Sequence, residues 1–206
     1  MNRTQPQLIS VKIEKLHPTQ ITVGKEEVAL KRKEWSKLSK KARDTSLHQH
    51  WFPAVTGPDG KHYIVDHHHF GLALLEEEVK TGWLLLLKDL SSLNPANFWT
   101  VMDHHQWVHP YDNDGIRRDF AALPARLESL QDDPYRSLAG ELRRAGGYAK
   151  DVTPFSEFLW ADFLRSRISI GSVQKDFAKA LVKAKKLAAT QDAHYLPGWS
   201  GVITPA

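Results

Sequence analysis

The sequence predicts an α+β fold, with strands and helices mixed in the first half of the chain and helices alone in the second. Short apolar runs bounded by Gly and Pro turns lie between residues 8 and 90, which indicates a sheet. Three stretches of helical periodicity lie in the second half. The composition, 41% hydrophobic and 25% charged over 206 residues, is typical of a globular chain long enough to bury a substantial core.

The first predicted elements are a strand and a charged helix. Partial alternation over residues 8–14 indicates a short strand. Pro18 disfavours helix at the residue before it, so residues 17–20 are expected to form an irregular loop. Residues 25–41 are rich in helix-forming charged residues and predict a helix. Its expected buried residues are Val28, Trp35 and Leu38.

A hairpin is predicted next. Strand-like runs over residues 52–56 and 62–66 flank the sequence Gly-Pro-Asp-Gly at residues 57–60, which is a strong turn signal. A helix should follow over about residues 68–80, and Gly82 is its expected C-terminal stop.

The remaining elements complete the sheet and form the helical half. Residues 83–90 predict a strand apolar enough to be central. Asn94 and Pro95 form a helix cap and first turn, so a helix should run to about Trp107. Asp162 falls in an apolar stretch and requires a partner, for which a nearby arginine is the expected choice. Three further helices are expected over about residues 133–145, 154–168 and 172–190.

Composition excludes several kinds of site. The chain has no cysteine, which excludes disulfides, zinc–thiolate sites, iron–sulfur clusters and cysteine nucleophiles. No run approaches 18 apolar residues, so we expect a soluble protein without a membrane partner. We expect a cytoplasmic location, and the composition also suits the periplasm. The net charge of +4 permits a polyanionic partner without requiring one, and the lysines of residues 31–41 offer one basic helix face.

The strongest local signal is Asp66-His67-His68-His69, which joins a predicted strand to a predicted helix. Amide groups and the positive end of the helix dipole gather at such a junction, so it favours an anion. The histidines can donate to phosphate, and Asp66 can cap the helix or orient an imidazole. The competing interpretation is a capped helix with solvated histidines.

A metal site is the weaker interpretation of the same residues. Asp66 and His68 would need ligands from a second histidine cluster, comprising Asp103, His104, His105 and His109. Phosphoesterases with an Asp-His-His motif also need aspartate pairs on earlier strands, and no such pair precedes Asp66. We therefore assign no metal ligand. The sequence at residues 112–115 lacks the later Glu of a calcium loop and predicts a turn.

Glu26 and Glu27 follow a glycine at the start of a predicted helix. A carboxylate held there can act as a general base on a hydroxyl group. The alternative is an acidic first turn that stabilises the helix dipole.

The order of these parts resembles the ParB/sulfiredoxin superfamily and, within it, the Putative ParB-like nuclease branch. Residues 64–69 are similar to the family's strand-end motif, commonly Asp-Gly-His-His-Arg or Asp-Gly-His-Arg-Arg. Residues 16–28 resemble the first box of that branch, and residues 133–138 and 157–163 are also similar to it. The superfamily core covers roughly residues 8–90, and the likeness to the branch extends to about residue 195.

The resemblance implies a small mixed sheet with helices, followed by a helical C-terminal half. It implies a nucleotide-binding core over residues 1–115 and a helical extension, packed on that core, over residues 116–206. Nucleotide phosphates, from ATP or ADP together with Mg²⁺, should contact the two boxes. The implied contact residues are Thr19, Gln20, Asp66, His67, His68 and His69.

Free-serine kinases of this fold use a glutamate near the start of the helix after the first loop as base, a role that falls here on Glu26 or Glu27. We therefore expect phosphoryl transfer from ATP or ADP to a small hydroxyl substrate. The alternatives are a ParB-like nuclease and a non-enzymatic DNA-binding or partition-type module. Sulfiredoxin chemistry is excluded because its cysteine has no counterpart. His67 replaces the usual Gly, and Phe70 replaces an Arg that would bind phosphate in bidentate fashion.

Overall fold

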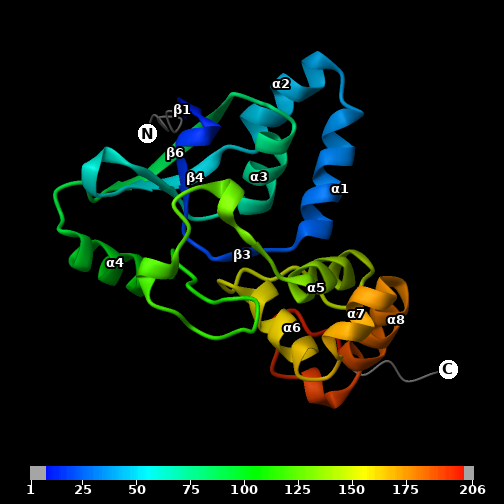
Figure 1. Cartoon of the computed structure of the whole chain (residues 1–206). Coiled ribbons are helices and arrows are strands. Elements are labelled where there is room, and N and C mark those ends of the chain that lie inside the picture. Colours follow the sequence, from blue (N-terminus) through cyan, green and yellow to red (C-terminus); the bar gives the residue numbers. More distant parts are fainter. Residues whose placement is uncertain (1–7, 202–206) are drawn as a thin grey trace, which may run out of the picture. The chain divides into compact units, whose positions relative to one another are not determined.

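The computed structural model describes residues 8–201 (Figure 1). These residues form two compact units. Unit 1 comprises residues 8–23 and 28–131, and unit 2 comprises residues 24–27 and 132–201. This division concerns packing alone, so the domain boundary expected near residue 115 stays a prediction. The predicted α+β class, with a mixed sheet first and a mostly helical half second, is confirmed.

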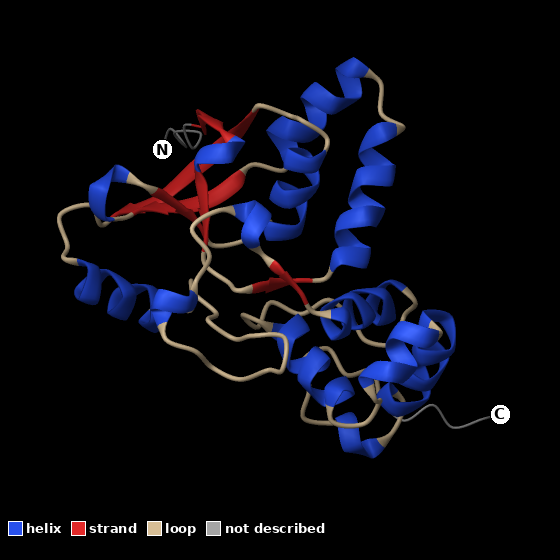
Figure 2. Cartoon of the chain, viewed as in Figure 1, coloured by secondary structure: helices blue, strands red, loops and turns tan. Residues whose placement is uncertain are grey.

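Unit 1 is built on a five-stranded sheet with the strand order β1-β6-β4-β5-β2. Figure 2 shows the strands in red. The β1–β6 and β4–β5 pairs are antiparallel, whereas the β4–β6 and β2–β5 pairs are parallel. A separate two-stranded sheet pairs β3 with β7. The strands are β1 (Leu8–Lys12), β2 (Leu16–Pro18), β3 (Thr22–Val23), β4 (Phe52–Thr56), β5 (His62–Ile64), β6 (Thr81–Asp89) and β7 (Gln131–Asp132).

The helices are distributed over both halves of the chain. The α-helices are α1 (Lys25–Ser36), α2 (Lys40–Gln49), α3 (His68–Glu76), α4 (Pro95–His104), α5 (Pro134–Arg144), α6 (Ser156–Arg165), α7 (Ile170–Lys175) and α8 (Phe177–Ala188). Short 3₁₀ helices cover Ile13–Lys15, Pro58–Gly60, Phe120–Ala122, Leu127–Ser129 and Gln191–Ala193. None of the helices within residues 8–201 is long and apolar enough to cross a membrane.

The sheet of unit 1 carries a hydrophobic core on each face. Successive strand residues point to opposite faces. Ala54 and Ile64 accordingly join one core with residues of α1 and α3, while the adjacent Val55 and Tyr63 join another with residues of α4. Helices α3 and α4 therefore cover opposite faces of the sheet.

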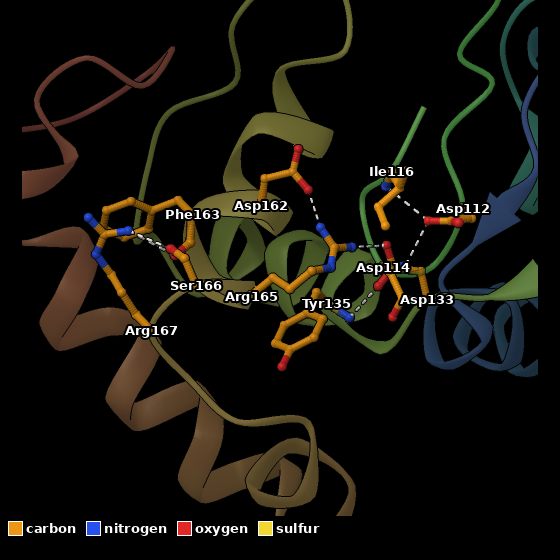
Figure 3. Close-up of polar contacts among 10 residues, drawn as sticks. All are labelled: Asp112, Asp114, Ile116, Asp133, Tyr135, Asp162, Phe163, Arg165, Ser166 and Arg167. Atoms are coloured by element: carbon orange, nitrogen blue, oxygen red, sulfur yellow. Dashed lines mark hydrogen bonds and ion pairs between the residues drawn. The ribbon is translucent and has the colours of Figure 1, made fainter. Parts of the chain in front are cut away.

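Unit 2 is a helical cluster around Trp160, which is fully buried. Its ring stacks on that of Tyr148 with centroids 4.3 Å apart, and its indole N–H donates to the carbonyl of Pro197 at 2.8 Å. The middle helix of this half is central, as the sequence predicts. The ion pair expected for Asp162 is confirmed, although Asp162 is exposed and not buried in the apolar face of its helix. Its partner is Arg165, which also binds Asp133 at 2.5 Å (Figure 3).

The sequence predictions fail at several element boundaries in unit 1. Residues 17 and 18, expected to lie in an irregular loop, belong to β2 (Leu16–Pro18), which pairs with β5. The single helix expected over residues 25–41 is two helices, because Ser39 accepts a hydrogen bond from Ala42 and starts α2. Gly82 is not a helix stop. Helix α3 ends at Glu76, and Gly82 lies within β6.

The last predicted helix, over residues 172–190, is also interrupted. Asp176 ends α7 with an extended φ of −154°. The same residue caps α8, since its carboxylate accepts from the backbone N–H of Lys179 at 2.9 Å. A capping Asp within a helical pattern therefore starts a new helix instead of continuing the old one.

The segment Gly24–Glu27 belongs to unit 2, and its backbone contacts Asp132 at the end of β7 and Ser137 of α5. The amide of Lys25 donates to the carboxylate of Asp132 at 2.9 Å, and the amide of Glu26 donates to the hydroxyl of Ser137 at 3.2 Å. Two amides that the first turn of α1 leaves without an intrahelical partner are thus bound. A Cβ atom on Gly24 would lie 2.6 Å from the backbone N of Ser137.

Gly24→Ala should lower the free energy of unfolding by about 1–3 kcal/mol, the usual cost of overpacking, because backbone atoms cannot move aside as a flexible side chain can. Urea denaturation of the purified variant measures this. Gly171→Ala is the matched control, since nothing lies within 4 Å of its Cβ position and alanine is the better helix former. Equal stability of the two variants would contradict the close approach at Gly24.

Candidate functional site

Parallel pairing of β2 with β5 brings the predicted phosphate-binding residues to one edge of the sheet. Pro18 is the register partner of Ile64. The two strands therefore end together, and Thr19 and Gln20 leave β2 where residues 65–67 leave β5 to enter α3. We call these residues the strand-end site: Thr19, Gln20, Asp66, His67, His68 and His69.

Thr19 is the residue through which the two strand ends contact each other. Its hydroxyl donates to the carbonyl of Ile64 at 2.8 Å. Its backbone N–H donates to Nε2 of His68 at 3.1 Å, and its carbonyl accepts from the amide of His109 at 2.8 Å. His68 is 4% exposed. Because Nε2 of His68 is an acceptor here, a phosphate contact from this ring would have to use Nδ1.

His67 occupies the turn that starts α3. It has a φ of 65°, in the left-handed region that favours glycine. Its backbone N–H donates to the Asp66 carboxylate at 2.6 Å, and its ring Nδ1 lies 2.9 Å from the carbonyl of Trp51. His67 is the residue before the first helical turn, and its side chain does not cap α3. Asp66 therefore holds the turn by accepting a hydrogen bond from the backbone N–H of His67.

Gln20 is the least expected member of the site. It is 6% exposed, and its side-chain Nε2 has no hydrogen-bond partner. A buried amide nitrogen without an acceptor costs about 1–3 kcal/mol. Such an amide nitrogen can donate a hydrogen bond to an acceptor atom of a bound ligand.

The second histidine cluster has other contacts. Asp103 pairs with Arg117 at 2.9 Å, and the ring of His105 stacks on Trp107 with centroids 4.2 Å apart. The ring of His109 stacks on Tyr111 in the same way. Within residues 8–201, no group of three or more His, Asp or Glu side chains is placed to hold a metal ion.

The candidate bases lie in unit 2. Glu26 is exposed, whereas Glu27 is 6% exposed and lies 3.9 Å from a guanidinium nitrogen of Arg144. The Oε2 atom of Glu27 and the Oε1 atom of Glu157 both lie within 3.0 Å of the point that a Cβ on Gly140 would occupy. Only glycine leaves room for this convergence of carboxylates.

Glu157 was not singled out from the sequence, although it lies in the first turn of α6 in one of the family-like stretches. Arg143 lies 3.3 Å from its carboxylate. Burial raises the pKa of Glu157; Arg136 lowers it and Glu27 raises it further. The sequence signal that could have indicated Glu157 is the pair Arg143 and Arg144 at the end of α5, because their charges need acidic partners.

Comparison with known proteins identifies the family. The family model described as "Putative ParB-like nuclease" matches residues 9–166. The chain belongs to this family. The crystal structure of protein Atu1540 from Agrobacterium tumefaciens is similar, with a TM-score of 0.89 and 46% sequence identity. That similarity covers 96% of this chain and 100% of Atu1540. No curated protein matches the chain.

Two positions of this ParB-like chain differ from the family's usual strand-end motif. His67 adopts the backbone conformation that explains why glycine is usual there. Phe70, in place of an arginine, packs its ring on that of Phe52 with centroids 6.1 Å apart. This chain therefore has an aromatic ring packed on Phe52 at the position where arginine is usual.

The free energy of unfolding should fall as the pH drops below about 6.5, in part because of His67. Burial lowers the pKa of His67 from its ordinary 6.5, with Asp66 opposing the shift. Between 6.5 and the lower folded-state pKa, the unfolded chain binds a proton that the folded chain does not, so folding is disfavoured there. His67→Asn, which tolerates positive φ, should make the loss shallower.

Denaturant titrations between pH 5 and pH 7 measure these slopes. His104→Asn, at an exposed position of α4, controls for the removal of one imidazole. The prediction is wrong if the free energy of unfolding of His67→Asn falls with pH as steeply as that of the native protein.

Proposed function

We propose that this protein binds ATP or ADP with its phosphates at the strand-end site and transfers a phosphoryl group to a small hydroxyl substrate. The observation that carries the proposal is the convergence of Thr19, Gln20 and the start of α3 at one edge of the sheet. Backbone amides and the positive end of a helix dipole stabilise phosphate oxygens there. Mg²⁺ would neutralise the charge of the phosphates, as is usual for this chemistry.

The individual residues support distinct parts of this role. His69, at the first turn of α3, is half-buried. Its position suits a donor to a phosphate oxygen. His68 holds Thr19 and thereby shapes the edge. Glu26 and Glu27 are the proposed bases. Adjacent helical residues point about 100° apart, so one of the two would serve the acceptor hydroxyl.

Nuclease activity is the second candidate, and the family description favours it. One structural observation weighs against a large nucleic-acid surface on α1. The guanidinium of Arg32 is bound by the carboxylates of Glu76 and Glu77, each at 2.9 Å, which reduces the basic character of that face. Salt separates the two candidates, because DNA binding weakens steeply as salt rises whereas a nucleotide pocket responds less.

His69→Ala should weaken nucleotide binding by about 1–3 kcal/mol, the usual cost of losing a donor to a charged acceptor. Titration calorimetry with ATP and ADP, with and without Mg²⁺, measures the change. His104→Ala is the control at an exposed position. Binding of native strength in folded His69→Ala would exclude this side chain from the phosphate site. Failure of the native protein to bind either nucleotide would reject the proposed function.

Glu26→Gln or Glu27→Gln should lower the rate of phosphoryl transfer by about 10²- to 10⁴-fold, the usual contribution of a general base. Nucleotide affinity should hardly change, since the carboxylate contacts the acceptor hydroxyl and not the phosphates. Single-turnover transfer to candidate hydroxyl compounds is the measurement. Full activity in both variants would remove the glutamates from the mechanism and favour nucleotide sensing or nuclease action.

A further inference from the structure

A stacked pair of aromatic rings lies next to the strand-end site. The ring centroids of His109 and Tyr111 are 4.2 Å apart and the ring planes differ by 17°. The carbonyl of Thr19 accepts from the amide of His109, and the amide of Thr19 donates to His68. One residue thus connects the start of α3 to the ring pair, of which the sequence analysis named only His109, as a candidate metal ligand.

Gln20 lies beside this ring pair. Gln20 and His109 form a parallel β-bridge, and residues paired in this way project their side chains to the same face. Gln20 is also the residue whose buried Nε2 has no hydrogen-bond partner. A stacked pair of partly buried rings and a buried amide donor are therefore neighbours at the edge where we place the phosphates.

The loop that carries Tyr111 is held in place by Asp112. One carboxylate oxygen of Asp112 accepts from the amides of Asp114 and Ile116, at 3.0 and 2.9 Å (Figure 3). The other oxygen binds Arg118 at 2.5 Å. Tyr111 itself forms an antiparallel bridge with Arg117. A ring fixed in this way loses little freedom when a ligand stacks on it.

We propose that Tyr111 and Gln20 form the base-binding part of the strand-end site and that the base they select is adenine. The proposal rests on the proposed nucleotide function. Aromatic rings bind the faces of all bases, so Tyr111 supplies affinity without selection. A Gln amide matches adenine in particular, because it donates to N7 and accepts from the N6 amino group. Guanine presents two acceptors on that edge and matches this amide less well.

Three ligands separate the base from the phosphates: pyrophosphate, ADP and GDP, each with Mg²⁺, measured by titration calorimetry. The native protein should bind ADP at least about tenfold more tightly than pyrophosphate, a difference that corresponds to about 1.4 kcal/mol. It should also prefer ADP to GDP. Tyr111→Leu should lose about tenfold in ADP affinity and keep its pyrophosphate affinity. Tyr111→Phe retains the ring and should keep both.

Gln20→Met tests the selection of the base. The variant should bind ADP and GDP equally, whereas a Gln20 that contacts the phosphates instead of the base would weaken the binding of ADP, GDP and pyrophosphate alike. Its melting temperature without ligand should not fall, because methionine fills similar space and removes the unpartnered amide. A Gln20 with a purely structural role would lower the melting temperature on replacement. Tyr195→Leu, at an exposed tyrosine of unit 2, is the control.

The outcomes distinguish this inference from the function on which it rests. Pyrophosphate binding without any advantage for ADP, or ADP binding unchanged in Tyr111→Leu and Gln20→Met, overturns the base site and leaves the phosphate site standing. No binding of any of the three ligands overturns both. A preference for GDP over ADP overturns the assignment of adenine.

Discussion

Three residues of parallel pairing between β2 and β5 determine the geometry of the candidate site. Because both strands end at the same edge, two segments 45 residues apart in sequence meet through the Thr19–Ile64 hydrogen bond. His68, Gln20 and His109 all take their positions from Thr19 or from its neighbour. Because the strand pair is short, the hydrogen bonds of Thr19 with Ile64 and His68 contribute much of the contact between the ends of β2 and β5.

Much of the fold follows from local sequence patterns, and the elements that were predicted wrongly have identifiable causes. The turn at residues 57–60 and the cap at Asn94 are local signals, and both are found where expected. Strand β2 was missed because a three-residue run that contains Pro18 shows no alternation, and its partner lies far away in sequence. Gly82 was misassigned because a glycine after a helical pattern usually marks a helix end, whereas here it lies against Phe52 within a strand.

The candidate site was predictable in composition but not in its contacts. Family resemblance and the helix-start argument together indicated the residues at 19–20 and 66–69. They did not indicate that His68 would accept from Thr19, or that the amide of Gln20 would be buried without a partner. Nor did they indicate that Glu27 would converge with Glu157 over Gly140, since that depends on α5 and α6. Such facts arise from contacts between residues distant in sequence, which no local pattern encodes.

The four residues Gly24–Glu27 have a consequence for how members of this family can diverge. Unit 2 takes these residues from the N-terminal half of the chain and the rest from residue 132 onward. A recombination event that exchanged C-terminal halves between two relatives would separate Gly24 from the Ser137 it fits, and Glu27 from the arginines of α5. The two halves are therefore expected to be inherited together, with substitutions near Gly24 and at the start of α5 accumulating as matched pairs.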